Sequence, residues 1–156
     1  VIESEVFYNC QALSNIVIPN NVTTIESYAF QSCTGLTNVT IGSSVTSIVV
    51  DENNENYKSV DGNLYSKDGK TLIQYAIGKK NEEFVIPTGV TSIGENSFLG
   101  CESLTRVTVP DSVTSIGEYA FYECVSLTRI TIPDSVTSIG GNAFAYCSSM
   151  TSLIIG

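Results

Sequence analysis

The chain has 156 residues, of which 42% are hydrophobic and 15% charged, and 16 acidic against 7 basic residues give it a formal charge of −9. This composition is typical of a globular domain, and because no run of about 18 apolar residues occurs, we expect no membrane insertion. The acidic balance argues against a nucleic-acid partner, since proteins that bind the phosphate backbone carry a basic stripe.

A unit of 23 residues recurs along the chain. Cys101, Cys124 and Cys147 are separated by this step (124 − 101 = 147 − 124 = 23), and phenylalanines and prolines advance with them. A period of this length is the signature of a solenoid, in which each unit stacks on its neighbours and each repeated position forms a column on one surface. We therefore expect a single domain over residues 1–156, with one continuous hydrophobic stack, and we look for function in its columns.

Residues 1–48 hold the first units, each with one predicted strand. Leu13 and Leu36 open segments of the type L-x-x-L-x-L, whose final alternation indicates a strand with one inward face. A short extended return follows, and then an Ala-Phe-x-x-Cys segment whose spacing favours one turn of α- or 3₁₀-helix. The position that ends each strand is filled by Pro19, Gly42, Pro87, Pro110, Pro133 and Gly156.

Residues 49–80 break the period and are expected to form an irregular insert. Asp68-Gly69 lies between the strand-like segments 64–66 and 71–73, which predicts a β-hairpin because both central residues of such a turn need a positive φ. The polar stretch 51–62 is superficially similar to a calcium loop, but Asn56 and Gly62 stand where that loop needs Gly and Glu. A solvated loop is the alternative to a weak calcium site.

Residues 81–156 resume the repeats. We expect their cysteines to be reduced, buried thiols, because in-register side chains on stacked strands point the same way and do not converge on one another. The chain has no histidine and no C-x-x-C pair, so we expect no metal site and no cofactor. Without histidine there is also no Ser-His-Asp or Cys-His arrangement, and we expect no enzyme activity.

The repeats resemble a known family. The segment 109–127 reads V-P-D-S-V-T-S-I-G-E-Y-A-F-Y-E-C-V-S-L, and 132–149 follows the same pattern. These motifs are similar to the BspA-like leucine-rich repeats, also called the Treponema pallidum type, and residues 51–73 are similar to an insert that recurs in that family. Gly42 for Pro and Met150 for Leu depart from the pattern, and no surface anchor or sorting segment is visible.

The resemblance implies a fold and a location. The expected fold is a leucine-rich repeat solenoid, mainly β with short helical or 3₁₀ turns, in which 23-residue repeats form a right-handed curved solenoid interrupted by a β-hairpin insert. The resemblance also implies an extracellular or cell-surface bacterial protein, or a surface protein of a parasitic protist, that binds host matrix proteins or other microbes. It implies no catalytic residues.

The outward positions of the predicted strands are the main candidate site. They form two columns, one of Val17, Thr40, Val85, Thr108, Thr131 and Ile154, and one of Asn15, Asn38, Glu83, Arg106, Arg129 and Ser152. Arginine binds carboxylates bidentately and is enriched at interface hot spots, so this face is a candidate for partner binding. The alternative is a Glu83–Arg106 pair, a solvated Arg129 and threonines that simply favour strands. The residues proposed for binding are Arg106, Arg129, Thr108, Thr131, Glu83 and Asn38.

Tyr28 and Tyr119 share a column on the turn side, with Tyr122 and Tyr146 nearby, and form a secondary candidate surface. Partial packing into the core explains them equally well.

The leading functional prediction is a non-catalytic protein-binding or adhesion module that recognises a host matrix or microbial surface protein through its strand face. A structural spacer that assembles end to end through uncapped coils is one alternative. A second is carbohydrate binding by Tyr57, Tyr65 and Tyr75 in the insert, because aromatic rings can stack on sugars.

Overall fold

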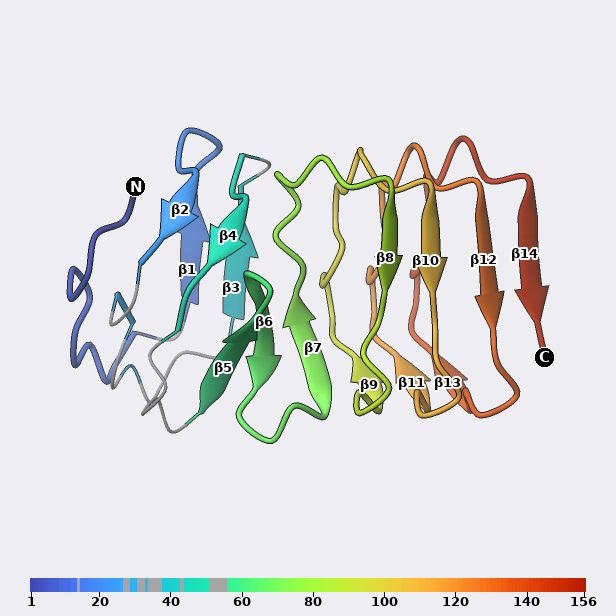
Figure 1. The fold of residues 1–156 in the computed structure, drawn as a ribbon, viewed down its shortest axis with the longest axis horizontal. Coiled ribbons are helices and arrows are strands. Elements are labelled where there is room, and N and C mark those ends of the chain that lie inside the picture. Colours follow the sequence, from blue (N-terminus) through green and yellow to red (C-terminus); the bar gives the residue numbers. More distant parts are fainter. Residues whose placement is uncertain (14, 27–28, 31–32, 34–37, 43, 51–55) are drawn as a thin grey trace.

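The computed structural model describes the chain except residues 14, 27–28, 31–32, 34–37, 43 and 51–55, and of residues 38–41 it describes the backbone alone. It is a rod of stacked coils built from short strands (Figure 1). The strands are β1 (Asn15–Ile18), β2 (Thr24–Ile25), β3 (Asn38–Ile41), β4 (Ser47–Ile48), β5 (Tyr57–Val60), β6 (Asn63–Ser66), β7 (Thr71–Gln74), β8 (Glu83–Val85), β9 (Ser92–Ile93), β10 (Arg106–Thr108), β11 (Ser115–Ile116), β12 (Arg129–Ile132), β13 (Ser138–Ile139) and β14 (Ser152–Ile155).

The coils from β8 to β14, which we call the C-terminal coils, carry two parallel ladders. Strands β8, β10, β12 and β14 form one sheet, and β9, β11 and β13 line up in another, with partners that are 23 residues apart. Val107 and Val109 point inward and are buried, as the L-x-x-L-x-L pattern predicts. The predicted period is therefore the stacking step of the coils.

Side chains that repeat with the period connect one coil to the next. The hydroxyl of Thr128 donates to the carbonyl of Thr105 at 3.0 Å, and that of Thr151 donates to the carbonyl of Thr128 at 3.2 Å. The thiol of Cys124 donates in the same way to the carbonyl of Phe98 at 3.2 Å. All five cysteines are free, in agreement with the prediction.

The turn side of the coils differs from the prediction. The described residues contain no helix, and therefore none that is long and apolar enough to span a membrane. Tyr119 and Glu123 have φ values of 53° and 56°, and two such left-handed residues four positions apart interrupt any helical run. The amide of Phe121 accordingly donates to the carbonyl of Ala143 in the next coil, at 2.8 Å, and the segment is a series of turns.

The insert forms an antiparallel meander of β5, β6 and β7, which we call the hairpin wall. Strands β6 and β7 form the predicted hairpin. A second hairpin joins β5 to β6 through Asp61 and Gly62, whose φ values of 49° and 71° match the type I′ turn that an Asp-Gly pair favours. Strand β7 also pairs in parallel with β9, so the wall continues the ladder of short strands.

The hairpin wall separates two hydrophobic cores. Leu72 and Tyr65 belong to the core of the C-terminal coils, whereas Leu64 belongs to the core of the coils before the insert and Ile73 packs against that core. Neighbouring residues of a strand point to opposite faces, so one pair of strands serves both cores. The expected single continuous stack is therefore wrong.

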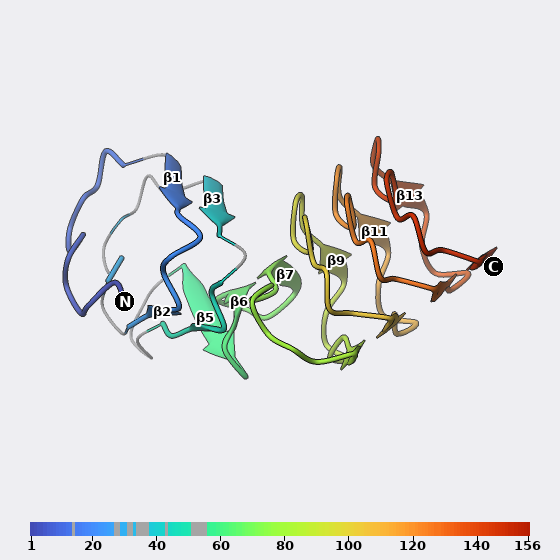
Figure 2. The ribbon, with the colours of Figure 1, turned by 90° about the horizontal axis from the view of Figure 1, so that it is seen from above.

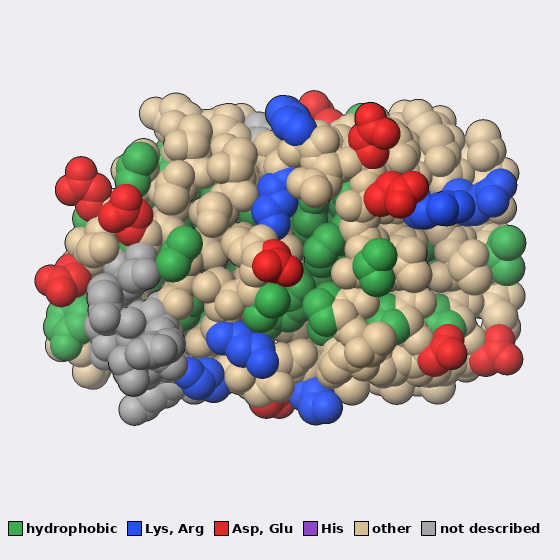
Figure 3. All heavy atoms as spheres, in the orientation of Figure 1, with side chains coloured by type: hydrophobic (Ala, Val, Ile, Leu, Met, Phe, Trp, Pro, Cys, Tyr) green, Lys and Arg blue, Asp and Glu red, His purple; other side chains and the backbone are tan. Residues whose placement is uncertain are grey.

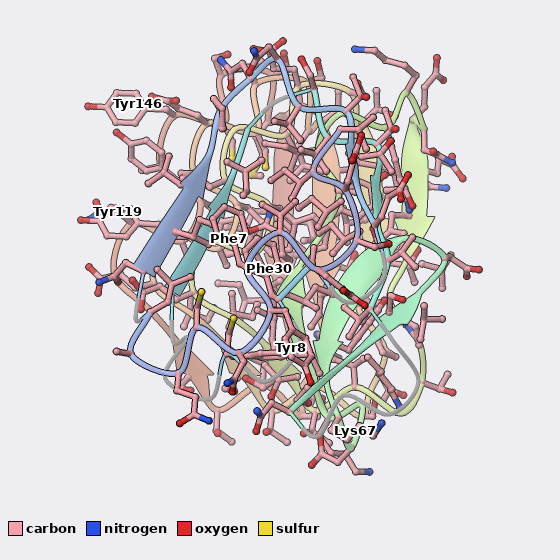
Figure 4. The ribbon with its side chains drawn as sticks, turned by 90° about the vertical axis from the view of Figure 1, so that its left-hand side faces the viewer. Phe7, Tyr8, Phe30, Lys67, Tyr119 and Tyr146 are labelled. Carbon is pink, nitrogen blue, oxygen red and sulfur yellow. The ribbon has the colours of Figure 1, made fainter. Side chains whose placement is uncertain are left out.

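The aromatic column is divided in the same place. Phe7 and Phe30 stack with ring centroids 5.1 Å apart, and Phe98, Phe121 and Phe144 form a separate stack at 4.7 and 5.2 Å. Figure 4 shows Phe7 and Phe30 inside the ring of coils.

The wall also changes the side on which the longer strands lie. The pair β1–β3 is a sheet of its own, and Figures 1 and 2 show it on the far side of the rod, behind β2 and β4. The sheet of β8, β10, β12 and β14 lies on the near side, and its strands run in the opposite direction in Figure 1. We call the coils of β1 to β4 the N-terminal coils.

Candidate functional site

The exposed face of the sheet β8–β10–β12–β14, which we call the strand face, carries most of the predicted site. The register places Glu83, Arg106 and Arg129 in one row and Val85, Thr108 and Thr131 in the next. Outward and inward positions alternate along each strand, so all of these side chains are exposed while Val107 and Ile130 between them are buried. The two columns therefore exist within this sheet.

The columns do not continue into the N-terminal coils. Asn38 lies in β3, which pairs with β1 in a different sheet on the opposite side of the rod. Sequence spacing aligned it with Arg106 because the 45 residues between Gly42 and Pro87 were counted as ordinary coils, whereas the hairpin wall changes the side of the sheet. The strand-face site therefore lacks Asn38.

Two shallow hollows flank the arginines. One, of about 420 Å³, is lined by Arg106 and Arg129 together with Thr108, Thr131 and Asp111, among others. The second, also of about 420 Å³, lies at the other side of the arginine row and is lined by the same two arginines with Glu83 and the threonine ladder. Figure 3 shows basic and acidic side chains adjoining over this part of the molecule.

The charges of the row are only partly compensated. A guanidinium nitrogen of Arg106 lies 3.9 Å from a carboxylate oxygen of Glu83, with 53% and 68% of the two side chains exposed. This is the pair that the alternative reading predicted, and an exposed pair of this kind stabilises a fold by roughly 0–1 kcal/mol. Within the described part of the chain, Arg129 forms no ion pair. Its guanidinium is available to a carboxylate from outside.

The turn side carries an exposed cluster of tyrosines. Tyr119 and Tyr146 each pack edge-on against Tyr122, with centroids 5.4 and 5.1 Å apart. Figure 4 shows Tyr119 and Tyr146 projecting away from the rod. Tyr28, which was predicted to share this surface, lies outside the described residues.

The backbone under this cluster is strained. Tyr119 and Tyr146 have φ values of 53° and 58°, in a region that Gly and Asn adopt most readily, and Asn96 and Asn142 occupy it in neighbouring coils. The spacing of 23 between Asn96, Tyr119 and Asn142 would have signalled these positions in the sequence.

The tyrosines proposed for carbohydrate binding do not form an exposed site. Tyr65 and Tyr75 are only 2% and 1% exposed, and burial raises the pKa of Tyr65 to about 12. Tyr75 stacks on Phe98 with centroids 5.3 Å apart and so extends the phenylalanine column into the wall. Its distance of 23 residues from Phe98 carries that signal in the sequence (98 − 75 = 23).

Metal binding and thiol chemistry find no support in the described residues. These contain no group of three His, Cys, Asp or Glu side chains able to hold a metal ion, and Asp51 to Glu55 of the candidate calcium loop lie outside them. Burial raises the pKa of the Cys101 and Cys124 thiols, which disfavours the thiolate that a nucleophile needs.

Comparison with protein families identifies the repeats. The model of the BspA type leucine-rich repeat region matches residues 1–53 and 74–156 in six copies. The chain belongs to this family. The unmatched residues between these two ranges hold β5, β6 and most of β7, so the BspA type repeats are interrupted by the hairpin wall.

Solved structures show the same fold. A leucine-rich repeat protein from Eubacterium ventriosum is similar to the chain at 29% identity with a TM-score of 0.72, over 92% of this chain and 36% of that protein. The pneumococcal vaccine antigen PcpA matches at 22% identity and a TM-score of 0.62, over 93% of this chain and 51% of the antigen.

A leucine-rich cell surface protein from Faecalibacterium prausnitzii matches at 24% identity and a TM-score of 0.51, over 98% of this chain and 62% of that protein. The chain thus spans less than two thirds of the length of each of these three relatives. Comparison with curated proteins finds no match.

Proposed function

We propose that the chain is a non-catalytic protein-binding module of an extracellular or cell-surface protein, and that it contacts its partner through the strand face. Membership of the BspA type family supports the module and its location. Two of the structural relatives are described as a vaccine antigen and a cell surface protein, although at their identity only the fold is shared. We treat residues 1–48 and 81–156 as repeats and 49–80 as an insert within one domain.

The observation that carries the proposal is the pair of arginines on the strand face. Arg106 and Arg129 are the only arginines of a chain with a formal charge of −9, and they are register partners on neighbouring strands. Stacking two like charges at the spacing of adjacent strands costs free energy unless an anion compensates them. Glu83 serves only one end of the row, so a carboxylate of the partner completes it.

The neighbouring rows add apolar contact area. Val85 and Ile154 are 65% and 52% exposed, and Thr108 and Thr131 lie between them in the same row. Apolar and threonine side chains around a charged pair fit a protein surface, in which a few arginine contacts carry most of the binding free energy.

The test is charge reversal on this face. A variant with Arg106→Glu and Arg129→Glu is compared with Lys70→Glu and Lys80→Glu, which changes the net charge equally at two exposed lysines on other elements. Binding is measured by biosensor against a panel of immobilised extracellular-matrix proteins. We expect the arginine variant to lose at least tenfold in affinity and the lysine variant to bind like the wild type. Equal affinities of the two variants would exclude the strand face.

The tyrosine cluster on the turn side is proposed as a secondary contact surface. Tyr146 is 69% exposed although its backbone is held in a strained conformation, and strain of this kind often marks functional positions. Tyr146→Ser in the same binding assay tests it, and unchanged affinity would remove this surface from the proposal.

A further inference from the structure

A lysine and an asparagine meet inside the hairpin wall. Asn63 is the first residue of β6 and is 1% exposed, and Lys79 follows β7 on the way to β8. The Nζ atom of Lys79 lies 3.0 Å from Oδ1 of Asn63 and also donates to the backbone carbonyl of Asp61. The amine and the side-chain amide are therefore already in contact.

The amide of Asn63 is held with its carbonyl polarised. Its Oδ1 accepts a second hydrogen bond from the backbone N–H of Ala76, at 3.1 Å. Two donors on one carbonyl oxygen withdraw electrons from Cγ and would stabilise negative charge on that oxygen during an attack on Cγ.

The nitrogen of the same amide is left over. Nδ2 of Asn63 is buried and has no hydrogen-bond partner among the described residues. A buried donor without a partner is destabilising, and such groups are rare in folded proteins. Since Oδ1 is fully engaged, exchanging the two ends of the amide would forfeit two bonds, so the orphan is not relieved by rotation.

The lysine is placed where its amine is reactive. Nζ lies 5.4 Å from the centroid of the Tyr75 ring, which shields it on one side. Burial lowers the pKa of Lys79, and the charge of Asp61 partly opposes that effect. A lysine that is deprotonated more readily is a better nucleophile.

We propose that Lys79 and Asn63 join in an intramolecular isopeptide bond. The neutral Nζ attacks Cγ of Asn63, and the Nζ–Cγ bond forms while the bond from Cγ to Nδ2 breaks. A proton passes from Nζ to the leaving nitrogen, and one molecule of ammonia is released for each bond formed. The Asp61 carboxylate is available to accept the proton that the lysine ammonium first loses. No oxidant, metal or cofactor takes part.

The bond removes the one atom of the cluster that has no partner. The atom expelled is Nδ2, whereas Oδ1 keeps the hydrogen bond from Ala76 and the new amide N–H can still donate to the Asp61 carbonyl. The cross-link would fasten the start of β6 to the chain beyond β7, within the element that separates the two cores.

The test is the intact mass of the whole chain, followed by peptide mapping. We expect the wild type to weigh one ammonia less than its sequence after incubation at alkaline pH, and trypsin to fail to cleave after Lys79. Lys79→Arg keeps the charge but cannot form the bond, and it should show the full mass. Lys80→Arg, a matched change at the neighbouring exposed lysine, should lose ammonia as the wild type does.

Two results would overturn the proposal. One is a wild type that keeps its full sequence mass after that incubation. The other is a loss of ammonia that persists in Lys79→Arg, because Asn63 would then have closed on its own backbone as a succinimide. Peptide mapping separates the two products, since only the isopeptide yields a branched peptide that contains both Asn63 and Lys79.

Discussion

The N-terminal and C-terminal coils are built from the same repeat, yet they present their longer strands on opposite sides of the rod. In each set, phenylalanine rings one coil apart stack nearly parallel, with interplanar angles of 3° for Phe7–Phe30 and 5° for Phe121–Phe144. What differs is the relation between the sets, which the hairpin wall determines. The repeat thus specifies how a coil stacks on the next coil, and the insert specifies which way a whole group of coils faces.

The two sets also differ in how deeply they bury the aromatic column. Phe98 is 0% exposed because it has Tyr75 of the wall on one side and Phe121 on the other. Phe30 is only half-buried. The wall therefore contributes a full aromatic layer to the C-terminal coils, and the following predictions test this asymmetry.

The largest effect is expected from Phe98→Ala. The change removes the ring that contacts Tyr75, Phe84 and Phe121, and truncation of a fully buried phenylalanine costs about 3–5 kcal/mol of unfolding free energy. Phe30→Ala is the matched variant in the N-terminal coils and should cost less. Denaturant unfolding measures both, and equal losses would contradict the asymmetry.

The two-sided role of the wall is tested by Leu72→Ala and Leu64→Ala. Each truncation should cost about 2–5 kcal/mol, because both side chains are buried. Hydrogen exchange followed by mass spectrometry should show faster exchange around β9 and β11 for Leu72→Ala and around β2 and β4 for Leu64→Ala. If both variants loosened the same coils, the division into two cores would be wrong.

The turns of the wall should differ in their tolerance of a side chain. Both Gly62 and Gly69 have positive φ, so alanine costs roughly 1–2 kcal/mol at either place. At Gly62 a Cβ would also lie 2.9 Å from Oγ and 3.2 Å from Cα of Ser47, whereas at Gly69 it would meet only the flexible end of Lys58. Thermal unfolding should therefore rank Gly62→Ala below Gly69→Ala, and the reverse order would count against the packing of the wall on β4.

A smaller gain is expected on the turn side of the C-terminal coils. Glu123 has a φ of 56°, and Gly100 occupies the same position one coil earlier. Glu123→Gly should relieve the strain and stabilise the fold by up to about 1 kcal/mol. Glu118→Gly, at an exposed position without a positive φ, should destabilise it by about 0.5–1 kcal/mol. Destabilisation by both would mean that the left-handed turn carries no strain.

The smallest effect at neutral pH is expected from Tyr65→Phe. Burial raises the pKa of Tyr65 from 10.0 to about 12, so between these values the folded state holds more protons than the unfolded state. Stability is then fully present below pH 10 and falls as the pH rises towards 12. Unfolding curves should show a shallower alkaline decline for Tyr65→Phe, and an unchanged decline would assign it to other groups.

The sequence predicted the coils well because each buried position repeats 23 times along the chain's own register. The strands around Val107, the hairpin of β6 and β7 and the pair of Arg106 with Glu83 all followed from local patterns. The second hairpin could have been predicted from Asp61-Gly62, which has the same turn chemistry as Asp68-Gly69.

Other features could not be read from such patterns. Tyr and Glu are not residues that favour a left-handed conformation, so the turns at Tyr119 and Glu123 read as a helical segment. The reversal of the sheet side, which removed Asn38 from the site, depends on how the whole hairpin wall packs between two cores. No periodic signal reports that arrangement.

The threonine ladder has a consequence for how such a protein changes its length over evolutionary time. Each hydroxyl of Thr105, Thr128 and Thr151 finds its acceptor one coil earlier, so every unit offers the next an identical coupling. Duplication or loss of a whole unit by recombination would leave every remaining coupling satisfied. Arrays of interchangeable units can therefore lengthen or shorten freely, and the hairpin wall is the one segment where such an exchange would fail.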